Sequence, residues 1–430
     1  MRGRKLTSPP LAIRSVNVFD SVAALIDGPM DVAVRDGLIT SLTPAGSTEL
    51  AAEVEIDGTG KTLIPGLIDA HWHTAFTAVP ADVAQLRELG YLFASAVAGA
   101  RKTLLRGFTT VRDLGGPVLG IKQAIDEGAI LGPRIYPCGG FISQTGGHGD
   151  FRLLNEAPRG VAGQLSYTEI IGAAVIADGE TEVLRGAREM LRRGASQLKL
   201  MAGGGCGSAF DPIDVTQYTE AEMRAAVQAA ENWGTYVTVH AYTPRAIRTA
   251  VAAGVRCIEH GHLIDEDTVA LLAEQDIWWC LQPFLDDEDT APLPPANRAK
   301  FLQVAAGTDL AYRLARKHKV KVAFGTDNLF DTELGSRHGA QLAKLTRWYT
   351  PAEALQQATI RNAELLAMSG PRNPYPGRLG VVAEGAIADL ILVDGDPIAD
   401  ISLITRPEQT FTAIIKDGRL VTAHGAGEGD

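Results

Sequence analysis

Two histidines separated by one residue, His71 and His73, follow an apolar run over residues 63–70. Such a run predicts a buried strand, and side chains at positions i and i+2 of a strand point to the same face, about 6.6 Å apart. Two imidazoles in this arrangement can reach one ion at about 2.0–2.1 Å each, the usual zinc–nitrogen distance. The pair indicates a metal site, although a histidine pair on a surface loop would have the same spacing.

Four more residues of ligand type stand at the ends of later apolar runs or inside one of them: Lys199, His240, His260 and Asp327. Each has an ordinary explanation on its own, since His240 could be a buried histidine without function and Asp327 a helix N-cap. Lys199 is unusual, because a lysine inside an apolar strand is costly unless it is paired or chemically altered. Together with the histidine pair, these residues favour a metal-dependent enzyme.

The elements that must position these side chains form a regular alternation in the middle of the chain. Apolar strand-like runs alternate with Ala-, Leu- and Arg-rich stretches typical of helices. With the run before His71 they give eight β/α repeats, the number found in a closed parallel barrel, where chemistry takes place at the C-terminal ends of the strands. The remaining seven strands are expected at 108–112, 134–138, 197–201, 235–240, 256–260, 277–282 and 321–324.

Both ends of the chain have a different pattern, with short strand-like runs separated by Asp-Gly turn signals such as Asp36-Gly37 and Asp417-Gly418. Two β-rich ends around a different middle predict one accessory module assembled from both termini. We therefore expect an α/β fold: a TIM-like (β/α)₈ barrel over residues 64–376 and a small β-sandwich module built from residues 1–63 and 377–430.

The composition is that of a soluble globular protein, with 46% hydrophobic and 21% charged residues among 430. A net charge of −11 without a basic block argues against a nucleic-acid partner. No apolar run reaches the roughly 18 residues of a membrane span, so no membrane partner is expected. The basic N-terminus lacks an apolar signal core, which favours a cytoplasmic location; an exported enzyme whose leader had been removed would have the same sequence.

The motifs around these residues resemble those of the amidohydrolase superfamily. The matching pieces are the Pro-Gly-Leu-Ile-Asp-Ala-His-Trp-His motif at 65–73, Lys199, the motifs at 239–241, 259–261 and 325–327, and the returning β-module at 380–397. Two Gly-rich segments, 139–150 and 201–205, resemble the imidazolonepropionase-like branch, which includes Xaa-Pro dipeptidase-like carboxypeptidases and ochratoxin-hydrolysing amidohydrolases.

The resemblance implies two zinc ions, although other divalent metals would suit the same ligands. His71, His73 and Asp327 would bind the first ion, and His240 and His260 the second. Lys199, carboxylated by carbon dioxide, would bridge them, because a carbamate is an anion that two cations stabilise. Asp327 would act as the catalytic base that moves a proton from water to the leaving amine.

Three further residues are candidates for contact with the substrate. His148 lies between glycines, which suggests a backbone that approaches a ligand closely, and we expect it to take part in catalysis by contacting a carbonyl or carboxylate. An ordinary surface-loop histidine is the alternative. Tyr242 and His338 are expected to bind substrate, and the acidic, proline-rich segment 283–295 is expected to form a loop over the barrel mouth.

The resemblance also implies the substrate class: dipeptides or N-acyl amino acids with a free carboxylate and an apolar or aromatic terminal residue, with ochratoxin A as the named candidate. A cyclic-amide hydrolase or a heterocycle deaminase is the alternative, and a non-catalytic homologue is a remote one. Lys199 favours the two-metal hydrolase, because the mononuclear deaminases generally lack the bridging lysine. A homo-oligomer is expected, possibly an octamer as in similar proteins.

Overall fold

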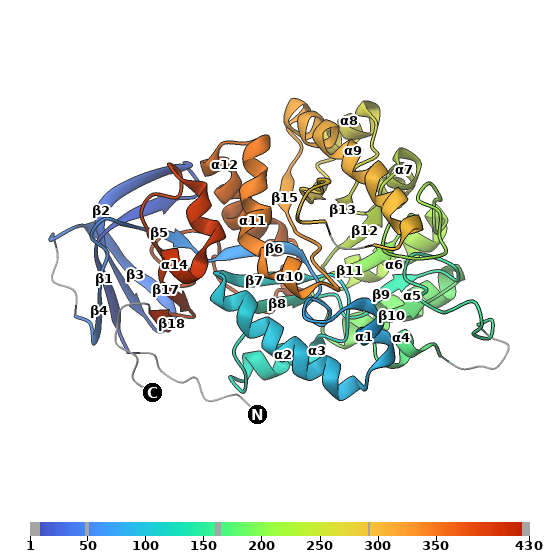
Figure 1. Ribbon diagram of the computed structural model, residues 1–430, viewed down its shortest axis with the longest axis horizontal. Coiled ribbons are helices and arrows are strands. Elements are labelled where there is room, and N and C mark those ends of the chain that lie inside the picture. The colour runs from blue at the N-terminus through green and yellow to red at the C-terminus, as the bar shows by residue number, and fades with distance from the viewer. Residues whose placement is uncertain (1–8, 48–50, 160–164, 291–292, 424–430) are drawn as a thin grey trace.

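The computed structural model describes residues 9–47, 51–159, 165–290 and 293–423. Figure 1 shows a β-sheet at one end of the molecule, built from both termini, and a ring of strands and helices at the other end. Among the described residues, no helix is both long and apolar enough to cross a membrane.

The terminal sheet joins the two ends of the chain through antiparallel pairing of β5 with β16. Its strand order is β18-β17-β16-β5-β1-β2-β3, with β4 beside β1. Apolar side chains from strands across this order, including β2, β5 and β17, enclose one core. The strands are β1 (Leu11–Asp20), β2 (Leu25–Arg35), β3 (Leu38–Pro44), β4 (Val54–Asp57), β5 (Lys61–Pro65), β16 (Leu390–Asp394), β17 (Phe411–Lys416) and β18 (Arg419–Ala423).

The barrel contains the eight expected strands, and all pairs between neighbours are parallel. Between β8 and β11 the short strand β9 (Phe141–Ser143) continues the third repeat and pairs with β11, while β10 (Ala174–Ile176) lies outside it. The predicted fold class is therefore confirmed. The barrel strands are β6 (Leu67–Trp72), β7 (Phe108–Asp113), β8 (Arg134–Pro137), β11 (Leu198–Met201), β12 (Val237–Ala241), β13 (Cys257–His260), β14 (Trp278–Leu281) and β15 (Val322–Phe324).

The barrel closes between β15 and β6 with the help of a side chain. Asn362, the first residue of α13 (Asn362–Ala367), donates from Nδ2 to the carbonyls of Ile68 (2.7 Å) and Phe324 (2.8 Å). Its Oδ1 accepts the Phe324 amide at 3.0 Å. At the C-terminal ends of these strands, the Asp327 amide donates to the His71 carbonyl at 2.9 Å, so the first and last strands hold these two residues together.

The apolar run over 63–70 is divided between the two parts of the molecule. Residues up to Pro65 belong to β5 of the terminal sheet, and β6 of the barrel begins at Leu67. Gly66 lies between the two strands. A larger residue does not fit at this position, because a Cβ atom there would lie 2.2 Å from the Thr109 hydroxyl. Both strands are buried, so the hydrophobic pattern does not reveal the change of sheet. The domain limits at 63/64 and 376/377 remain predictions.

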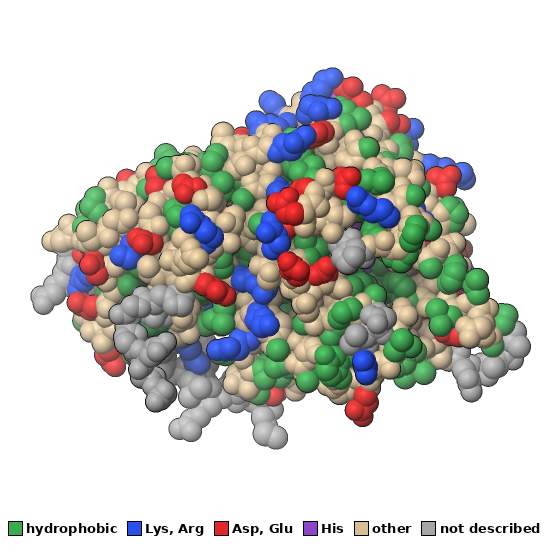
Figure 2. Space-filling view, viewed as in Figure 1, with side chains coloured by type: hydrophobic (Ala, Val, Ile, Leu, Met, Phe, Trp, Pro, Cys, Tyr) green, Lys and Arg blue, Asp and Glu red, His purple; other side chains and the backbone are tan. Residues whose placement is uncertain are grey.

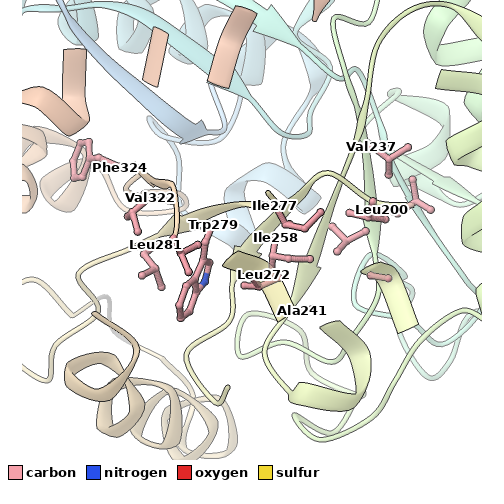
Figure 3. Packing of buried hydrophobic residues seen from close by; sticks show 14 of the residues in the cluster. Leu200, Val237, Ala241, Ile258, Leu272, Ile277, Trp279, Leu281, Val322 and Phe324 are labelled. Carbon is pink, nitrogen blue, oxygen red and sulfur yellow. The ribbon is translucent and has the colours of Figure 1, made fainter. Parts of the chain in front are cut away.

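Outer helices cover the barrel strands, and alternation along each strand decides which side chains face them. In β12, Val237 and Val239 belong to the apolar layer beneath the helices, while His240 is one position out of phase with them. Figure 3 shows part of this layer, with Ile258 and Trp279 on the next strands. The covering helices include α2 (Leu89–Leu105), α3 (Leu119–Asp126), α5 (Gly179–Arg192), α6 (Glu220–Asn232), α7 (Pro244–Ala252), α8 (Glu266–Glu274) and α9 (Pro295–His318).

Candidate metal centre

Five of the six predicted ligand residues lie near or just beyond the C-terminal ends of barrel strands β6, β12, β13 and β15. The sixth, Lys199, is the second residue of β11. Asp327 Oδ1 lies 3.3 Å from His71 Nε2 and 3.2 Å from His73 Nε2. The His260 ring lies 4.8 Å from the His71 ring and 4.6 Å from the His240 ring. Donor atoms of His71, His260 and Asp327 all lie within 4.8 Å of one another, a spacing that can hold a metal ion.

These side chains are buried at the bottom of the mouth. The histidines and Lys199 are at most 7% exposed, and the Asp327 side chain is 19% exposed. Histidine is almost absent from the described surface shown in Figure 2, which agrees with this burial. Water therefore reaches the group mainly through the side on which Asp327 lies.

The first histidine pair has one ring nitrogen of each member bound to an acceptor. His71 Nδ1 lies 2.8 Å from Glu259 Oε2, and His73 Nδ1 lies 2.8 Å from the Gly115 carbonyl. An acceptor oxygen fixes the proton on Nδ1, so the Nε2 lone pair of each ring is directed toward Asp327.

The second pair is arranged in the same way. His240 Nε2 lies 3.0 Å from the Gly204 carbonyl, which leaves Nδ1 as its ligand atom. His260 Nδ1 lies 2.7 Å from Gln282 Oε1, which leaves Nε2. In all four imidazoles one ring nitrogen is held by an acceptor oxygen, and the other nitrogen is the one that could bind a metal ion.

Titration behaviour agrees with this chemistry. Burial lowers the pKa of His240 and His260 well below the ordinary value, so both rings are neutral, as metal ligands must be. Burial alone would raise the pKa of Asp327, but His71 and His73 hold it well below its usual range. Burial alone would lower the pKa of His73, but Asp327 raises it above the ordinary value. The neutral rings are therefore those of the second pair, and they lie beside an ionised carboxylate.

Lys199 is the strongest sign that the group is incomplete without further atoms. Its ammonium nitrogen has no hydrogen-bond partner among the described residues, and burial lowers its pKa. A buried amine without a partner is costly. The neutral amine is the form that can react with carbon dioxide, and the resulting anion would suit two cations held by the surrounding imidazoles. The residues present therefore fit a carbamate-bridged metal pair.

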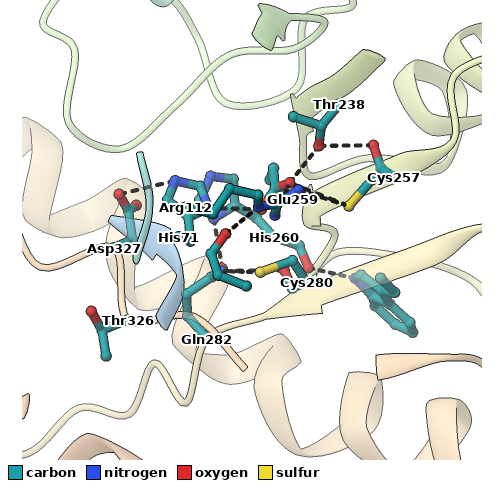
Figure 4. Close-up of polar contacts among 12 residues, drawn as sticks. His71, Arg112, Thr238, Cys257, Glu259, His260, Cys280, Gln282, Thr326 and Asp327 are labelled. Carbon is teal, nitrogen blue, oxygen red and sulfur yellow. Dashed lines mark hydrogen bonds and ion pairs between the residues drawn. The ribbon is translucent and has the colours of Figure 1, made fainter. Parts of the chain in front are cut away.

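A buried ion pair behind His71 was not predicted from the sequence. Arg112 donates to Glu259 Oε1 at 2.6 Å, and Thr238 also donates to this carboxylate; Figure 4 shows the cluster. Burial alone would raise the pKa of Glu259, but Arg112 and His71 hold it well below the usual range. The ionised carboxylate fixes the orientation of His71. Arg112 is 147 residues away from Glu259 in sequence, and only the barrel topology brings them together.

Two of the predicted ligands have left-handed backbone conformations, with φ of 74° at His260 and 54° at Asp327. Such values are costly for residues other than glycine and persist where the surrounding structure imposes them. Ile258 of β13 belongs to the layer beneath the helices, so alternation alone would direct His260 away from the mouth. The turned backbone directs its ring to the site instead.

His338 lies apart from the other candidates. It is fully buried, with its ring stacked between Trp72 (4.3 Å between centroids) and Phe108 (3.3 Å). Its Nε2 lies 2.7 Å from Asp69 Oδ2, and Asp69 also accepts the His71 amide at 2.8 Å. Because both faces of the ring are covered, the expected contact with substrate has no route, and His338 instead supports the strand that carries His71.

His148 and Tyr242 both lie beside the second histidine pair. The His148 ring stacks on His240 at 4.1 Å, and the Tyr242 ring lies 5.0 Å from His240 and 5.2 Å from His260. Burial raises the pKa of Tyr242 well above its ordinary value, so its hydroxyl remains a neutral donor. Both predicted substrate contacts therefore border the ligand group.

The acidic segment after β14 brings an aromatic ring to the site. Phe284 lies 6.2 Å from the His260 ring and 5.1 Å from the His262 ring. Ion pairs between Asp289 and both Arg337 and Lys344 hold the segment against the helices that follow β15. The sequence predicted a loop over the mouth here but did not identify Phe284; residues 291–292 of that loop lie outside the described residues.

The fold and the ligand geometry agree with a match of residues 62–421 to the model of the Amidohydrolase family. The chain belongs to the amidohydrolase family. Ochratoxinase from Aspergillus niger is 32% identical to this amidohydrolase over 385 residues, which cover 85% of this chain and 76% of the relative. The crystal structure of A. niger ochratoxinase has a TM-score of 0.84 at 26% identity, covering 98% of this chain and 97% of that chain.

Two peptidases are also similar to this amidohydrolase in structure. A prolidase in complex with N-methylphosphonate-L-proline has a TM-score of 0.88 at 34% identity, covering 96% of this chain and 100% of the prolidase. An Xaa-Pro dipeptidase with methionine bound in the active site has a TM-score of 0.83 at 27% identity, covering 96% of this chain and 100% of that chain. The predicted resemblance is confirmed, and family membership supports hydrolysis of amide bonds as the activity.

Proposed function

We propose that this amidohydrolase uses two zinc ions to remove a C-terminal apolar or aromatic amino acid from dipeptides and N-acyl amino acids, ochratoxin A among them. The observation that carries the proposal is the grouping of four imidazoles, each with one nitrogen bound to an acceptor, with a carboxylate and a buried lysine whose amine has no hydrogen-bond partner among the described residues. A homo-oligomer such as an octamer and a cytoplasmic location remain predictions.

The ligand set divides into two halves around Lys199. His71, His73 and Asp327 would hold one ion, and His240 and His260 the other, with carboxylated Lys199 between them. Two divalent cations bound there would lower the pKa of a shared water and polarise the scissile carbonyl. The dry surroundings strengthen these electrostatic effects.

In this proposal, Asp327 moves the proton. Its Oδ1 contacts His71 and His73, which leaves Oδ2 for the hydrogen of the attacking water. Because Asp327 is ionised, its carboxylate can accept that proton. The same carboxyl then delivers it to the nitrogen of the leaving amine, because an amine departs readily only after protonation.

Recognition of the departing amino acid would fall to the side of the site with His148, Tyr242 and Phe284. Tyr242 offers a neutral hydroxyl donor for a carboxylate or carbonyl. Phe284 and Tyr242 belong to a small apolar cluster with Ile213 and Val304 beside the second histidine pair. An apolar wall next to hydrogen-bond donors suits an apolar amino acid with a free carboxylate, and the names of the relatives support prolyl dipeptides and ochratoxin as starting points.

A substrate panel with matched pairs tests the proposal. The pairs are N-acetyl-phenylalanine with its carboxamide, Ala-Phe with Ala-Lys, and Ala-Pro with Pro-Ala, and ochratoxin A is added as a separate compound. We expect mass spectrometry to show release of phenylalanine or proline, and little turnover of the carboxamide or of Ala-Lys. Metal analysis on the same sample should give about two zinc ions per chain. Deamination of a heterocycle, ring opening of a cyclic amide, or one metal per chain would contradict the proposal.

A further inference from the structure

Helix α9 is pinned to the loop that follows β11 by a lysine. Lys300 Nζ donates to the carbonyls of Gly205 (3.1 Å), Ser208 (2.9 Å) and Asp211 (2.6 Å). An ammonium group has three donors, and all three are used here. Hydrogen bonds from a charged donor are stronger than those between neutral groups, so this contact fixes the loop firmly to the helix.

Asn297, three residues earlier on the same face of α9, adds to the contact. Its Nδ2 donates to the carbonyls of Cys206 (2.7 Å) and Ser208 (2.9 Å). Five hydrogen bonds from two side chains thus hold the loop over residues 205–211. The same helix reaches the apolar side of the site through Val304, which packs in the cluster with Tyr242.

The pinned loop holds His148. Ser208 Oγ lies 2.7 Å from His148 Nδ1, and Asp211 Oδ2 lies 3.5 Å from the same nitrogen. These oxygens accept the Nδ1 proton, which leaves Nε2 for a ligand. Gly205 lies directly against the ring, because a Cβ atom there would be 1.9 Å from His148 Cε1. Displacement of this loop would therefore displace the imidazole.

We infer that Lys300 is a positioning residue for His148, and this inference rests on the proposed function, in which His148 contacts substrate. Lys300 donates hydrogen bonds to the carbonyls of three residues, and each of these residues either binds the His148 ring or lies against it. The Gly204 carbonyl that orients His240 lies just outside the pinned segment, and the Gly204 amide is bonded to Val215 at 3.2 Å. Loss of Lys300 should therefore disturb His148 while the metal ligands keep their places.

Lys300→Met tests this, because methionine keeps the length of the side chain and removes the charge and all donors. The matched control is Gln303→Met on the exposed side of the same helix, where the amide donates to the Ala299 carbonyl of the helix itself. We expect Lys300→Met to lower kcat/KM for a phenylalanine-releasing substrate by about tenfold to a hundredfold. The control should keep the wild-type rate, and both proteins should keep their full metal content.

A double-mutant cycle shows whether the effect passes through His148. In a His148→Ala background, Lys300→Met should lower kcat/KM by less than about twofold, because the residue that Lys300 positions is absent. The same loss in that background, or a fall in metal content, would overturn the inference. Ser208→Ala, which deletes one contact to His148 and leaves α9 intact, covers the case in which Lys300→Met does not fold. It should give a loss that also disappears in the His148→Ala background.

A readout without substrate separates this inference from the proposed function. In ¹⁵N-histidine spectra, the ring signals of His148 are assigned by their absence from His148→Ala. Lys300→Met, or Ser208→Ala, should shift them, and Gln303→Met should not. Unchanged His148 signals would overturn the positioning role even in an active enzyme. Shifted signals in a protein that hydrolyses none of the panel would retain the positioning role and reject the proposed function.

Discussion

Replacing Lys199 with methionine should have opposite effects on the metal-free and metal-loaded protein. The Lys199 amine is buried and has no hydrogen-bond partner among the described residues. Methionine fills a similar volume without a polar amine. The substitution should therefore raise the free energy of unfolding of the metal-free protein. With metals bound, the same substitution removes the bridging ligand that we propose.

The structure sets the size of the first effect. An unsatisfied buried polar group costs about 1–3 kcal/mol, so metal-free Lys199→Met should have a free energy of unfolding higher than the wild type by that amount. Burial lowers the folded-state pKa of Lys199 below the ordinary value of 10.5. The unfolded chain therefore binds the Lys199 proton more tightly than the folded chain does. Below the folded-state pKa, the buried ammonium group destabilises the folded protein to the full extent. The advantage of methionine should shrink as the pH rises toward 10.5.

Guanidinium unfolding after chelation, followed by the fluorescence of tryptophans that include buried Trp72 and Trp279, measures this difference. Lys102→Met, at an exposed position on α2, is the matched control and should change the free energy of unfolding by less than about 0.5 kcal/mol. On addition of zinc, the wild type should become the more stable protein, because a ligand that binds only the folded state stabilises it by mass action. A metal-free Lys199→Met that is less stable than the wild type would refute the reasoning.

Three further substitutions test the site. Asp327→Asn should keep the fold, by circular dichroism, and lower kcat by about a hundredfold to ten-thousandfold, as loss of an acid–base catalyst does; a wild-type kcat would exclude the proposed proton transfer. Phe284→Ala should lower kcat/KM for a phenylalanine-releasing substrate by about tenfold to a hundredfold relative to an alanine-releasing one, since one apolar contact contributes about 1–3 kcal/mol. An equal loss for both substrates would show that Phe284 does not line the pocket. Gly205→Ala should expel His148 and reduce activity, whereas Gly207→Ala, where an added Cβ meets no atom within 4 Å, should not; equal activities would contradict the close approach of Gly205 to the imidazole.

The grouping of the proposed ligand residues could be predicted from the sequence, because the C-terminal ends of all barrel strands lie at the same face of the barrel. A residue at the end of a parallel barrel strand lies at the mouth whatever its neighbours are, so His71, His240 and Asp327 meet although the segments between them are long. Lys199 was identifiable for a second reason, since a charge inside an apolar strand needs an explanation. The structure provides the matching observation, since the amine has no hydrogen-bond partner in the part of the chain that the structure describes.

The residues that orient the ligands could not be predicted in this way. Glu259 contacts Arg112 across 147 residues, and Lys300 reaches Gly205 across 95. These side chains have no periodic pattern that marks them, and their partners are defined only once the strands and helices are in place. His338 shows the same limit, because its position at the start of α11 does not reveal that its ring lies between Trp72 and Phe108.

In the proposed site, the mouth of the barrel holds two metal ions joined through a modified Lys199. A crystal structure of the zinc-loaded protein, with anomalous data collected at the zinc edge, tests it most directly. We predict two anomalous peaks, one within bonding distance of His71, His73 and Asp327 and the other of His240 and His260, with carboxylate density continuous with Lys199 Nζ. A single peak, or two peaks beside an unmodified amine, would contradict the account.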